Sequence, residues 1–427
     1  MSAHPQIERR KGTRLKLSMG VAMLLGVYIT ELAGRFDLGR ISVLLEGIDV
    51  RIVLLGGISL WYLAWISVER PKPSYKPHLA PLVLFIAWLL LLTTTSLWTD
   101  PAAEVFQGVF DLALMGVLTV LAWAVARRTN VEAANLLFVT ALITSYIYLG
   151  AAITQGMDLT NRLSAFGGGP NVFVRVMLFG ALAALALAVI WHRPLLAMAC
   201  VPPLIGAVLS GSRGGLFAAV LVLLLAVFIV AKRVEWSRMV GASVPVLALL
   251  AAAWNWLPSD RRDYVRVRIL QQTFEERYTS SRDTLASYAL ELFREHPIGG
   301  AGLGSFSATF RPGMDGYHAH NLVLSTVAEG GLLATILLFG ALVAAVVFLV
   351  RRRPLSVEVQ FLALFSFFIF IASMFSGDYY DSRFLWFFMV LAVVWGAPRV
   401  ETANTHKKTP STRTKSNWPQ ISQRDCG

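Results

Sequence analysis

Two histidines lie two residues apart, directly before a long apolar run. His318 and His320 belong to the stretch Tyr317–Asn321, and the apolar run starts at its end. An imidazole titrates near neutral pH, so it can accept a proton or donate a hydrogen bond. The pair could also be half of a metal site, or His320 could simply be hydrogen-bonded, but no DxD or HExxH motif accompanies it. We therefore predict acid–base chemistry here, with no metal and no cofactor.

Two arginines occupy positions that favour an anion. Arg213 lies in the small-residue break Ser210–Gly215 between two apolar runs, where a ligand can come close to the backbone. Arg282 opens a predicted helix, whose free N–H groups and dipole attract negative charge. A guanidinium group binds phosphate through two parallel hydrogen bonds. Both arginines are predicted to bind an anion, a phosphate or a carboxylate, although Arg213 could instead snorkel to the membrane surface and Arg282 could pair with Asp283.

Weaker signals surround these residues. Arg162 and Arg175 are further candidates for the anion, with structural pairing as the alternative for each. Glu329 follows His320 by nine residues, about two and a half helical turns, so it cannot orient that imidazole and is expected to bind backbone or an arginine. The glycine-rich stretch Pro297–Phe306 could present N–H groups to a phosphate, but it lacks the GK[ST] ending of a P-loop.

The elements that must position these residues are membrane helices. Of the 427 residues, 56% are hydrophobic and 15% charged, and the mean hydropathy is +0.60, which excludes a soluble enzyme. Apolar runs of the length that crosses a bilayer predict an all-α polytopic membrane protein with twelve transmembrane helices. The predicted spans are 17–34, 45–67, 79–98, 105–126, 132–154, 171–191, 194–211, 214–231, 239–257, 321–350, 357–376 and 384–398.

The distribution of basic residues predicts the orientation. With the N-terminus inside, all eight lysines fall on cytoplasmic segments, as the positive-inside rule expects, and both termini are cytoplasmic. Every basic residue left on the outer side is an arginine, so the net charge of +12 points to an anion at the outer face and not to nucleic acid. Pairing of these arginines with outer acidic groups is the alternative.

One long segment interrupts the short loops. Residues 258–320 form an outer loop domain with eight arginines and eight acidic residues, so its chemistry must depend on particular side chains. Apolar residues at helical spacing between Ser281 and Pro297 predict an amphipathic helix lying on the bundle. The full division is a cytoplasmic N-terminus (1–16), spans one to nine (17–257), the loop domain (258–320), spans ten to twelve (321–398) and a disordered basic cytoplasmic tail (399–427).

The motifs together resemble one enzyme superfamily, the bacterial O-antigen ligases and O-antigen polymerases. The resemblance is concentrated in about residues 210–331 and rests on Ser212-Arg213, Arg282, the Pro297–Phe306 stretch, His320-Asn321 and Glu329-Gly330. It implies transfer of a glycan from undecaprenyl diphosphate at the periplasmic face of the bacterial inner membrane.

The resemblance also implies roles for single residues. The essential histidine of the superfamily falls on His320, and its diphosphate-binding arginines fall on Arg213 and Arg282. Arg162 and Arg175 are looser carry-overs as diphosphate ligands. His318, Asn321 and Glu329 are expected to support the site.

The function expected from this resemblance is that of an O-antigen ligase of lipopolysaccharide synthesis. Two arginines and a helix N-terminus can stabilise a diphosphate leaving group without a metal, and attack opposite it inverts the anomeric centre. The expected partners are undecaprenyl diphosphate-linked O-antigen, lipid A–core and membrane lipids. The alternatives are an O-antigen polymerase or protein O-oligosaccharyltransferase with the same donor, and a transporter of the lipid-linked glycan. We disfavour the transporter because no internal repeat is evident.

Overall fold

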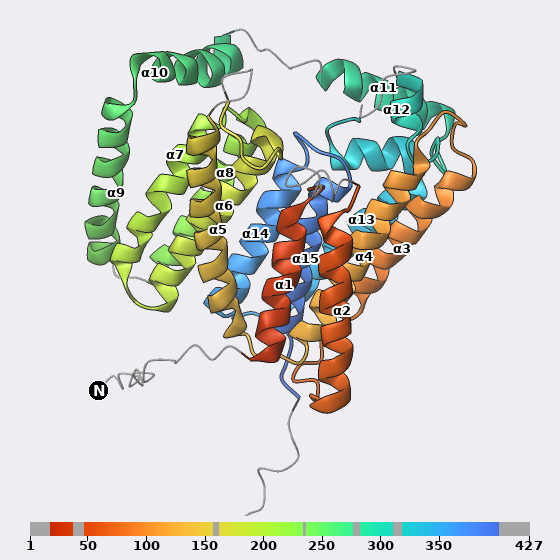
Figure 1. Cartoon of the computed structure of the whole chain (residues 1–427), viewed down its shortest axis with the longest axis horizontal. Helices are drawn as coiled ribbons and strands as arrows, with labels where there is room; N and C mark the ends of the chain where they lie inside the picture. The colour runs from red at the N-terminus through yellow and green to blue at the C-terminus, as the bar shows by residue number, and fades with distance from the viewer. Residues whose placement is uncertain are drawn as a thin grey trace, which may run out of the picture.

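The computed structural model of the chain describes residues 18–36, 47–156, 162–233, 236–275, 282–310 and 318–400. Over these residues the fold is helical, and an isolated antiparallel β-bridge joins Tyr75 and Arg399. The expected all-α class is confirmed (Figure 1). The larger α-helices are α1 (Met19–Ala33), α2 (Val50–Val68), α3 (Ala80–Thr94), α4 (Val105–Ala126), α5 (Ala133–Gln155), α6 (Gly169–Ile190), α7 (Val201–Leu209), α8 (Arg213–Ala231), α9 (Trp236–Trp256), α11 (Arg282–Glu295), α13 (Leu322–Arg351), α14 (Val357–Ala372) and α15 (Arg383–Trp395). Short helices are α10 (Ser259–Val265), α12 (Ser305–Phe310) and the 3₁₀-helices Thr95–Leu97, Pro194–Cys200 and Tyr380–Ser382, and a π-helix covers Arg266–Glu275.

Seven of the described helical segments are long and apolar enough to cross a membrane: α2, α3 with its 3₁₀ extension, α4, α5, α6, α8 and α13. Each of the twelve predicted spans contains helix, but several of these helices are shorter than a bilayer crossing requires. The structure therefore supports a polytopic membrane protein, while the number twelve stays a prediction.

Local sequence explains where the helices around the site begin. Asn321 caps α13, since its Oδ1 accepts hydrogen bonds from the backbone N–H groups of Val323 and Leu324, both at 3.0 Å. Pro170 lies in the first turn of α6, where its missing N–H costs nothing. The prolines at 194, 202 and 203 divide the predicted span 194–211 into a 3₁₀-helix and the short α7.

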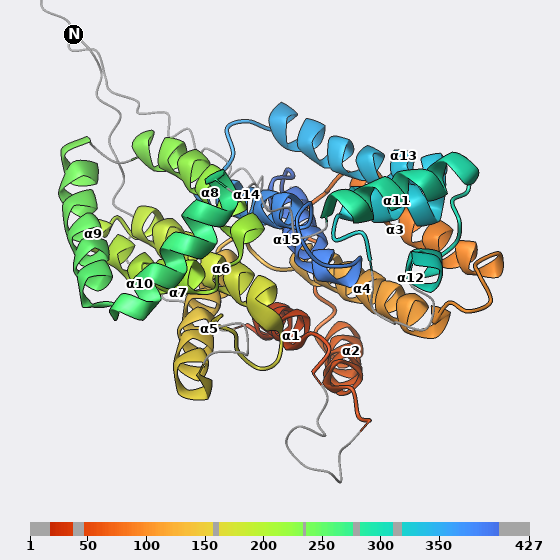
Figure 2. The ribbon, with the colours of Figure 1, turned by 90° about the horizontal axis from the view of Figure 1, so that it is seen from above.

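The centre of the bundle is formed by α6 and α15. All thirteen residues of α15 are buried, and so is most of α6. Seen along the bundle in Figure 2, the other long helices surround these two. This central position places the residues that precede α15, 373–382, in the middle of one end of the bundle.

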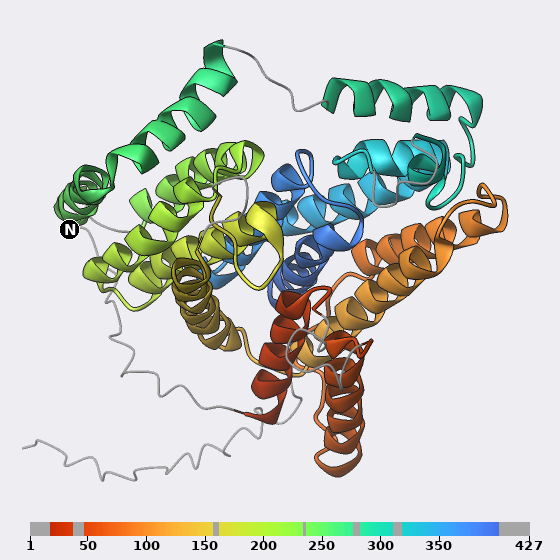
Figure 3. The ribbon, with the colours of Figure 1, turned by 45° about the horizontal axis from the view of Figure 1, so that its top comes forward.

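Helices α10, α11 and α12 all lie at that end, which we call the cap end, with α10 next to α9 and with α11 and α12 on the side of α3 (Figures 1 and 3). The opposite end carries the connections around residues 69–76 and 127–131, where the N–H of Ser74 donates to the carbonyl of Arg127 at 2.6 Å. Helix α1 begins and α15 ends at this opposite end (Figure 1). The helices of the predicted loop domain are thus gathered on one end of the molecule.

Some predicted features fall outside the described residues. They are the cytoplasmic N-terminus 1–16, the basic tail from residue 401, and the positions of Ser281 and Tyr317. Their predicted roles stay predictions.

Candidate active site

Helix α11 is the amphipathic helix expected in the loop domain. Its apolar side, Leu285, Ala289 and Leu292, is buried in a small cluster with residues of α12 and α13. The ring of Tyr288 contacts that of Phe306 in α12 at a centroid distance of 5.4 Å. Arg282, the first residue of α11, is therefore fixed at the cap end by the packing of the helix behind it.

The glycine-rich stretch is folded against a break in α13. Gly331 has φ +63°, which interrupts the helix and leaves carbonyl groups without helical partners. Backbone N–H groups of Ala301 and Gly302 donate to the carbonyls of residues 328 and 329 at 2.9 and 3.1 Å. Glu329 Oε1 accepts from the N–H groups of Gly304 at 3.1 Å and Phe306 at 3.4 Å. Several N–H groups of this stretch thus stabilise the break, and Glu329 binds backbone as expected.

This break gives a stability prediction. In Gly331→Ala the added Cβ would lie 2.4 Å from the carbonyl oxygen of Ile298, and the positive φ disfavours any side chain. We expect the free energy of unfolding to fall by at least about 2 kcal/mol. Thermal unfolding in detergent measures it, with Gly340→Ala of the same helix as the control, because its nearest neighbour, Leu84, lies at an ordinary 3.5 Å. Equal melting temperatures for the two variants would contradict this account of the break.

His320 is held at the start of α13 in an uncommon backbone conformation. Its φ is +51°, and its ring meets the ring of His318 edge-on at a centroid distance of 4.1 Å. The next residue, Asn321, caps α13 and also donates from Nδ2 to the carbonyl of Met374 at 3.1 Å. The imidazole Nδ1 of His320 is buried and has no hydrogen-bond partner among the described residues. A strained, fixed imidazole with an open nitrogen suits a role toward a substrate.

The surroundings of His320 keep its imidazole neutral. Burial lowers its pKa to about 4, and the nearby groups of His318 and Arg282 contribute. The carboxylates of Asp381 and Asp378 act in the opposite sense. At neutral pH the ring can therefore accept a proton, and the two carboxylates are placed to stabilise the imidazolium that results.

The small-residue break before α8 positions Arg213. Ser212 precedes it and donates from its hydroxyl to Asn171 Oδ1 at 2.7 Å. Arg162 donates from Nε to the carbonyl of Ser210 at 3.0 Å. Gly211 has φ +60° and leaves room for the Tyr264 hydroxyl, which a Cβ at this position would meet at 2.4 Å. Glycine is therefore required here because the chain turns and a side chain packs over it.

Four guanidinium groups gather beside this break. Burial lowers the pKa of the Arg282 guanidinium, and three neighbouring arginines lower it further, namely Arg213, Arg162 and Arg268. Three of these four were singled out in the sequence, and Arg268 was missed because the loop domain contains eight arginines without a distinguishing motif. Like charges at close range repel, so this arginine cluster is stabilised when an anion enters it.

Arg175 occupies a different position. It is buried in α6, where Nη1 donates to the carbonyl of Asp381 at 2.8 Å and Nη2 donates to the carbonyl of Ser376 at 2.9 Å. These contacts hold the turn 376–381 that carries the two carboxylates next to His320. Direct contact of Arg175 with a diphosphate stays a prediction.

A network of ion pairs at the cap end was not foreseen. Arg35 Nη2 lies 2.5 Å from both Asp111 Oδ2 and Asp378 Oδ2, and Arg51 Nη1 lies 2.7 Å from Asp111 Oδ1. Burial raises the pKa of Asp378, but Arg35 and His318 outweigh it, so the pKa is lowered overall. Asp111 and Arg51 lie inside predicted spans, and a search for charged residues within the spans would have identified them.

In the described part of the chain, no group of three or more His, Cys, Asp or Glu residues could hold a metal ion.

Comparison with known families finds a match over part of the chain. Residues 198–339, about a third of the chain, match the model of the O-Antigen ligase family. This segment contains Arg213, Arg282 and His320. A search of curated proteins finds no match. The family match agrees with the resemblance drawn from the motifs and supports the O-antigen ligase and polymerase superfamily.

Proposed function

We propose that the protein is an O-antigen ligase that transfers the glycan of undecaprenyl diphosphate-linked O-antigen to lipid A–core. The observation that carries the proposal is the adjacency of the arginine cluster and a neutral imidazole. Arg282 is close enough to His320 to lower the pKa of its imidazole, and the other three guanidinium groups are close enough to Arg282 to lower the pKa of its guanidinium group. A diphosphate bound to these arginines would thus lie within reach of a base.

In the proposed reaction, a hydroxyl oxygen of the acceptor attacks the anomeric carbon of the donor. The bond between this carbon and the phosphate oxygen breaks, and the electron pair leaves with undecaprenyl diphosphate. Arg213 and Arg282, assisted by Arg162, bind the diphosphate and stabilise the charge that develops on it. His320 receives the hydroxyl proton as attack proceeds and later releases it to water. Attack from the side opposite the diphosphate inverts the anomeric configuration.

The proposed location is the bacterial inner membrane, with the cap end in the periplasm. Basic residues at the opposite end support this orientation, since Arg127 and Arg128 contact the 69–76 connection, which contains Arg70, Lys72 and Lys76. Lysine and arginine prefer the cytoplasmic side of membrane proteins. Cysteine accessibility labelling at these connections in intact cells tests the orientation.

The neutral state of His320 gives a pH prediction. The pKa of His320 is lowered to about 4, so the base form is present at all pH values above it. Because kcat/KM reports groups on the free protein, its decline on the acidic side is expected near pH 4, and not near the 6.5 of an ordinary imidazole. Initial rates of glycan transfer between pH 4 and 8 measure it. If the rate instead falls to half its maximum near pH 6.5, and variants of His320 do not show this fall, the imidazole would not be neutral as assigned.

Reconstitution tests the function itself. Purified protein is mixed with undecaprenyl diphosphate-linked glycan and lipid A–core, without nucleotide and with a chelator, and the products are identified by gel and mass spectrometry. Lipid A–core that carries the glycan is the expected product. Longer lipid-linked glycan with unmodified lipid A–core would identify a polymerase. Glycan transferred only to added acceptor protein would identify an oligosaccharyltransferase. Movement of donor between leaflets without a new covalent product would identify a transporter.

A further inference from the structure

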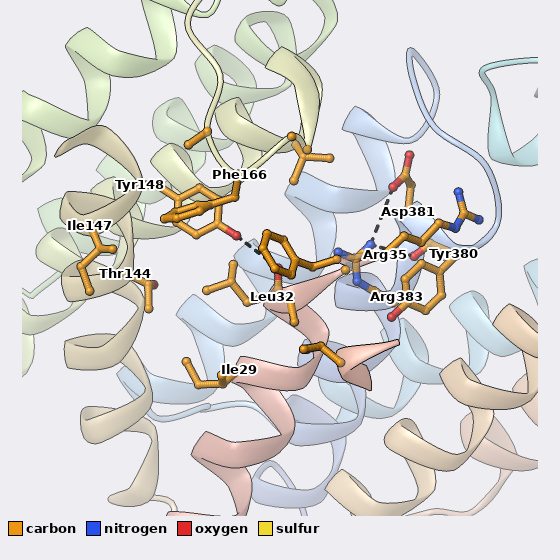
Figure 4. A pocket seen from close by; sticks show the side chains of 18 residues that line it. Ile29, Leu32, Arg35, Thr144, Ile147, Tyr148, Phe166, Tyr380, Asp381 and Arg383 are labelled. Carbon is orange, nitrogen blue, oxygen red and sulfur yellow. Dashed lines mark hydrogen bonds and ion pairs between the residues drawn. The ribbon is translucent and has the colours of Figure 1, made fainter. Parts of the chain in front are cut away.

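A cavity of about 470 Å³ lies beside the candidate active site. Its walls come from α1, α5, residues 165–168, the start of α6 and the 3₁₀-helix Tyr380–Ser382 (Figure 4). One part of the lining is apolar, with Ile29, Leu32 and Ile147. The part at the cap end is polar, with Arg35, Asp381 and Arg383. One cavity therefore combines an apolar part, which suits a hydrocarbon chain, with a polar part, which can form hydrogen bonds.

The apolar part of the cavity opens on the side of the bundle that a bilayer would cover. Ile29 and Ile147 line it and are nevertheless 38% and 55% exposed. Both belong to apolar helices, and α5 is long enough to cross a membrane. A hydrocarbon chain can thus enter sideways between α1 and α5, without leaving the apolar layer.

The charges at the polar end are already balanced. Arg383 donates from Nε to the carbonyl of Glu31 at 2.7 Å, and its Nη1 lies 3.7 Å from Asp381 Oδ1. Arg35 pairs with two carboxylates of the ion-pair network. A phosphate would therefore bind more weakly here than at the arginine cluster, where like charges repel one another until an anion binds. Hydroxyl groups, in contrast, can bind Asp381 and Arg35 without any change in net charge.

Two aromatic rings belong to the same lining. Phe166 and Tyr148 meet at a centroid distance of 4.8 Å, and both line the cavity (Figure 4). Such rings present apolar faces to which the C–H face of a sugar ring can pack. Asp381 also connects this cavity to the site, since its backbone carbonyl binds Arg175 and its carboxylate acts on His320.

We propose that this cavity binds the acceptor glycolipid, with an acyl chain between α1 and α5 and its hydroxyl-bearing sugars next to Asp381 and Phe166. The inference rests on the proposed function, which requires two lipid-anchored substrates at one site. The donor diphosphate takes the arginine cluster, and the acceptor approaches His320 from the cavity past Asp381.

The test fills the entrance of the cavity. Ile147→Trp places a larger side chain in the lining at an exposed position that tolerates it. Ile143→Trp is the matched control, one turn earlier on α5, where Ile143 is 53% exposed and does not line the cavity. Transfer rates are measured at varied lipid A–core with saturating donor, and at varied donor with saturating lipid A–core. Equilibrium binding of lipid A–core is measured without donor.

For Ile147→Trp, the KM and Kd for lipid A–core are expected to increase at least about tenfold, because the larger side chain fills the entrance that the acyl chain needs. A tenfold increase corresponds to a loss of about 1.4 kcal/mol in binding free energy. The kcat and the donor KM should stay within about twofold of wild type, and Ile143→Trp should match wild type. An increase confined to the donor KM would place the polyprenyl chain in the cavity and overturn the proposal, and so would unchanged constants. If the wild-type protein forms no product with lipid A–core, the proposed function fails, and a weaker Kd in Ile147→Trp alone still supports the cavity as a glycolipid site.

Discussion

His320→Ala is expected to reduce glycan transfer about 10³-fold, because a positioned base commonly contributes between about 10² and 10⁴ and alanine cannot replace it. His320 is strained, fixed by the neighbouring cap of α13, and open at a buried Nδ1 among the described residues. His318 contacts its ring edge-on and contributes to its field, so His318→Ala should cost less, about tenfold. The initial rate with purified donor and lipid A–core measures both effects.

The control for this prediction is His296→Ala, which removes an exposed imidazole just beyond the end of α11. Gel filtration and thermal unfolding show whether each variant is folded. A folded His320→Ala protein with normal turnover would exclude His320 as the base. A greater loss in His318→Ala than in His320→Ala would move that role to His318.

Removal of either anion-binding arginine is expected to have the second-largest effect. Arg213→Ala and Arg282→Ala should each lower kcat about 10² to 10³-fold, as loss of one group that stabilises developing negative charge typically does. Arg282→Lys keeps the charge but loses the two parallel hydrogen bonds of the guanidinium group, so it should recover only part of the activity. Arg294→Ala, at an exposed position on the same helix, should leave the rate unchanged.

Stability separates this role from a structural one. Because neighbouring guanidinium groups repel Arg282, its removal should not lower the melting temperature of the substrate-free protein. Arg383→Ala, in contrast, leaves Glu31 buried without its partner and should lower the melting temperature clearly. A large loss of stability in Arg282→Ala would mean that the arginine cluster holds the fold together, and that no anion is needed to balance it.

The apolar runs determined the fold class and most helix positions, because the length and polarity of a segment are local properties. The same holds for the amphipathic helix of the loop domain, which begins at Arg282. Boundaries were less accurate where prolines or glycine changed the local geometry, as between Pro194 and Val201 and at Gly331. Residue type alone also identified the imidazole and most of the arginine cluster.

The tertiary structure decided which of these residues share a site. Arg35 pairs with partners 76 and 343 positions away, and no local pattern encodes such a pair. The glycine-rich stretch proved to stabilise a helix break, since its N–H groups meet carbonyls that the break leaves unpaired. The cavity beside Asp381 also exists only because α1, α5 and the turn before α15 meet at one end of the bundle. Chain composition thus determined the chemistry available, and packing between distant segments determined where it is assembled, since contacts across hundreds of residues depend on the fold as a whole.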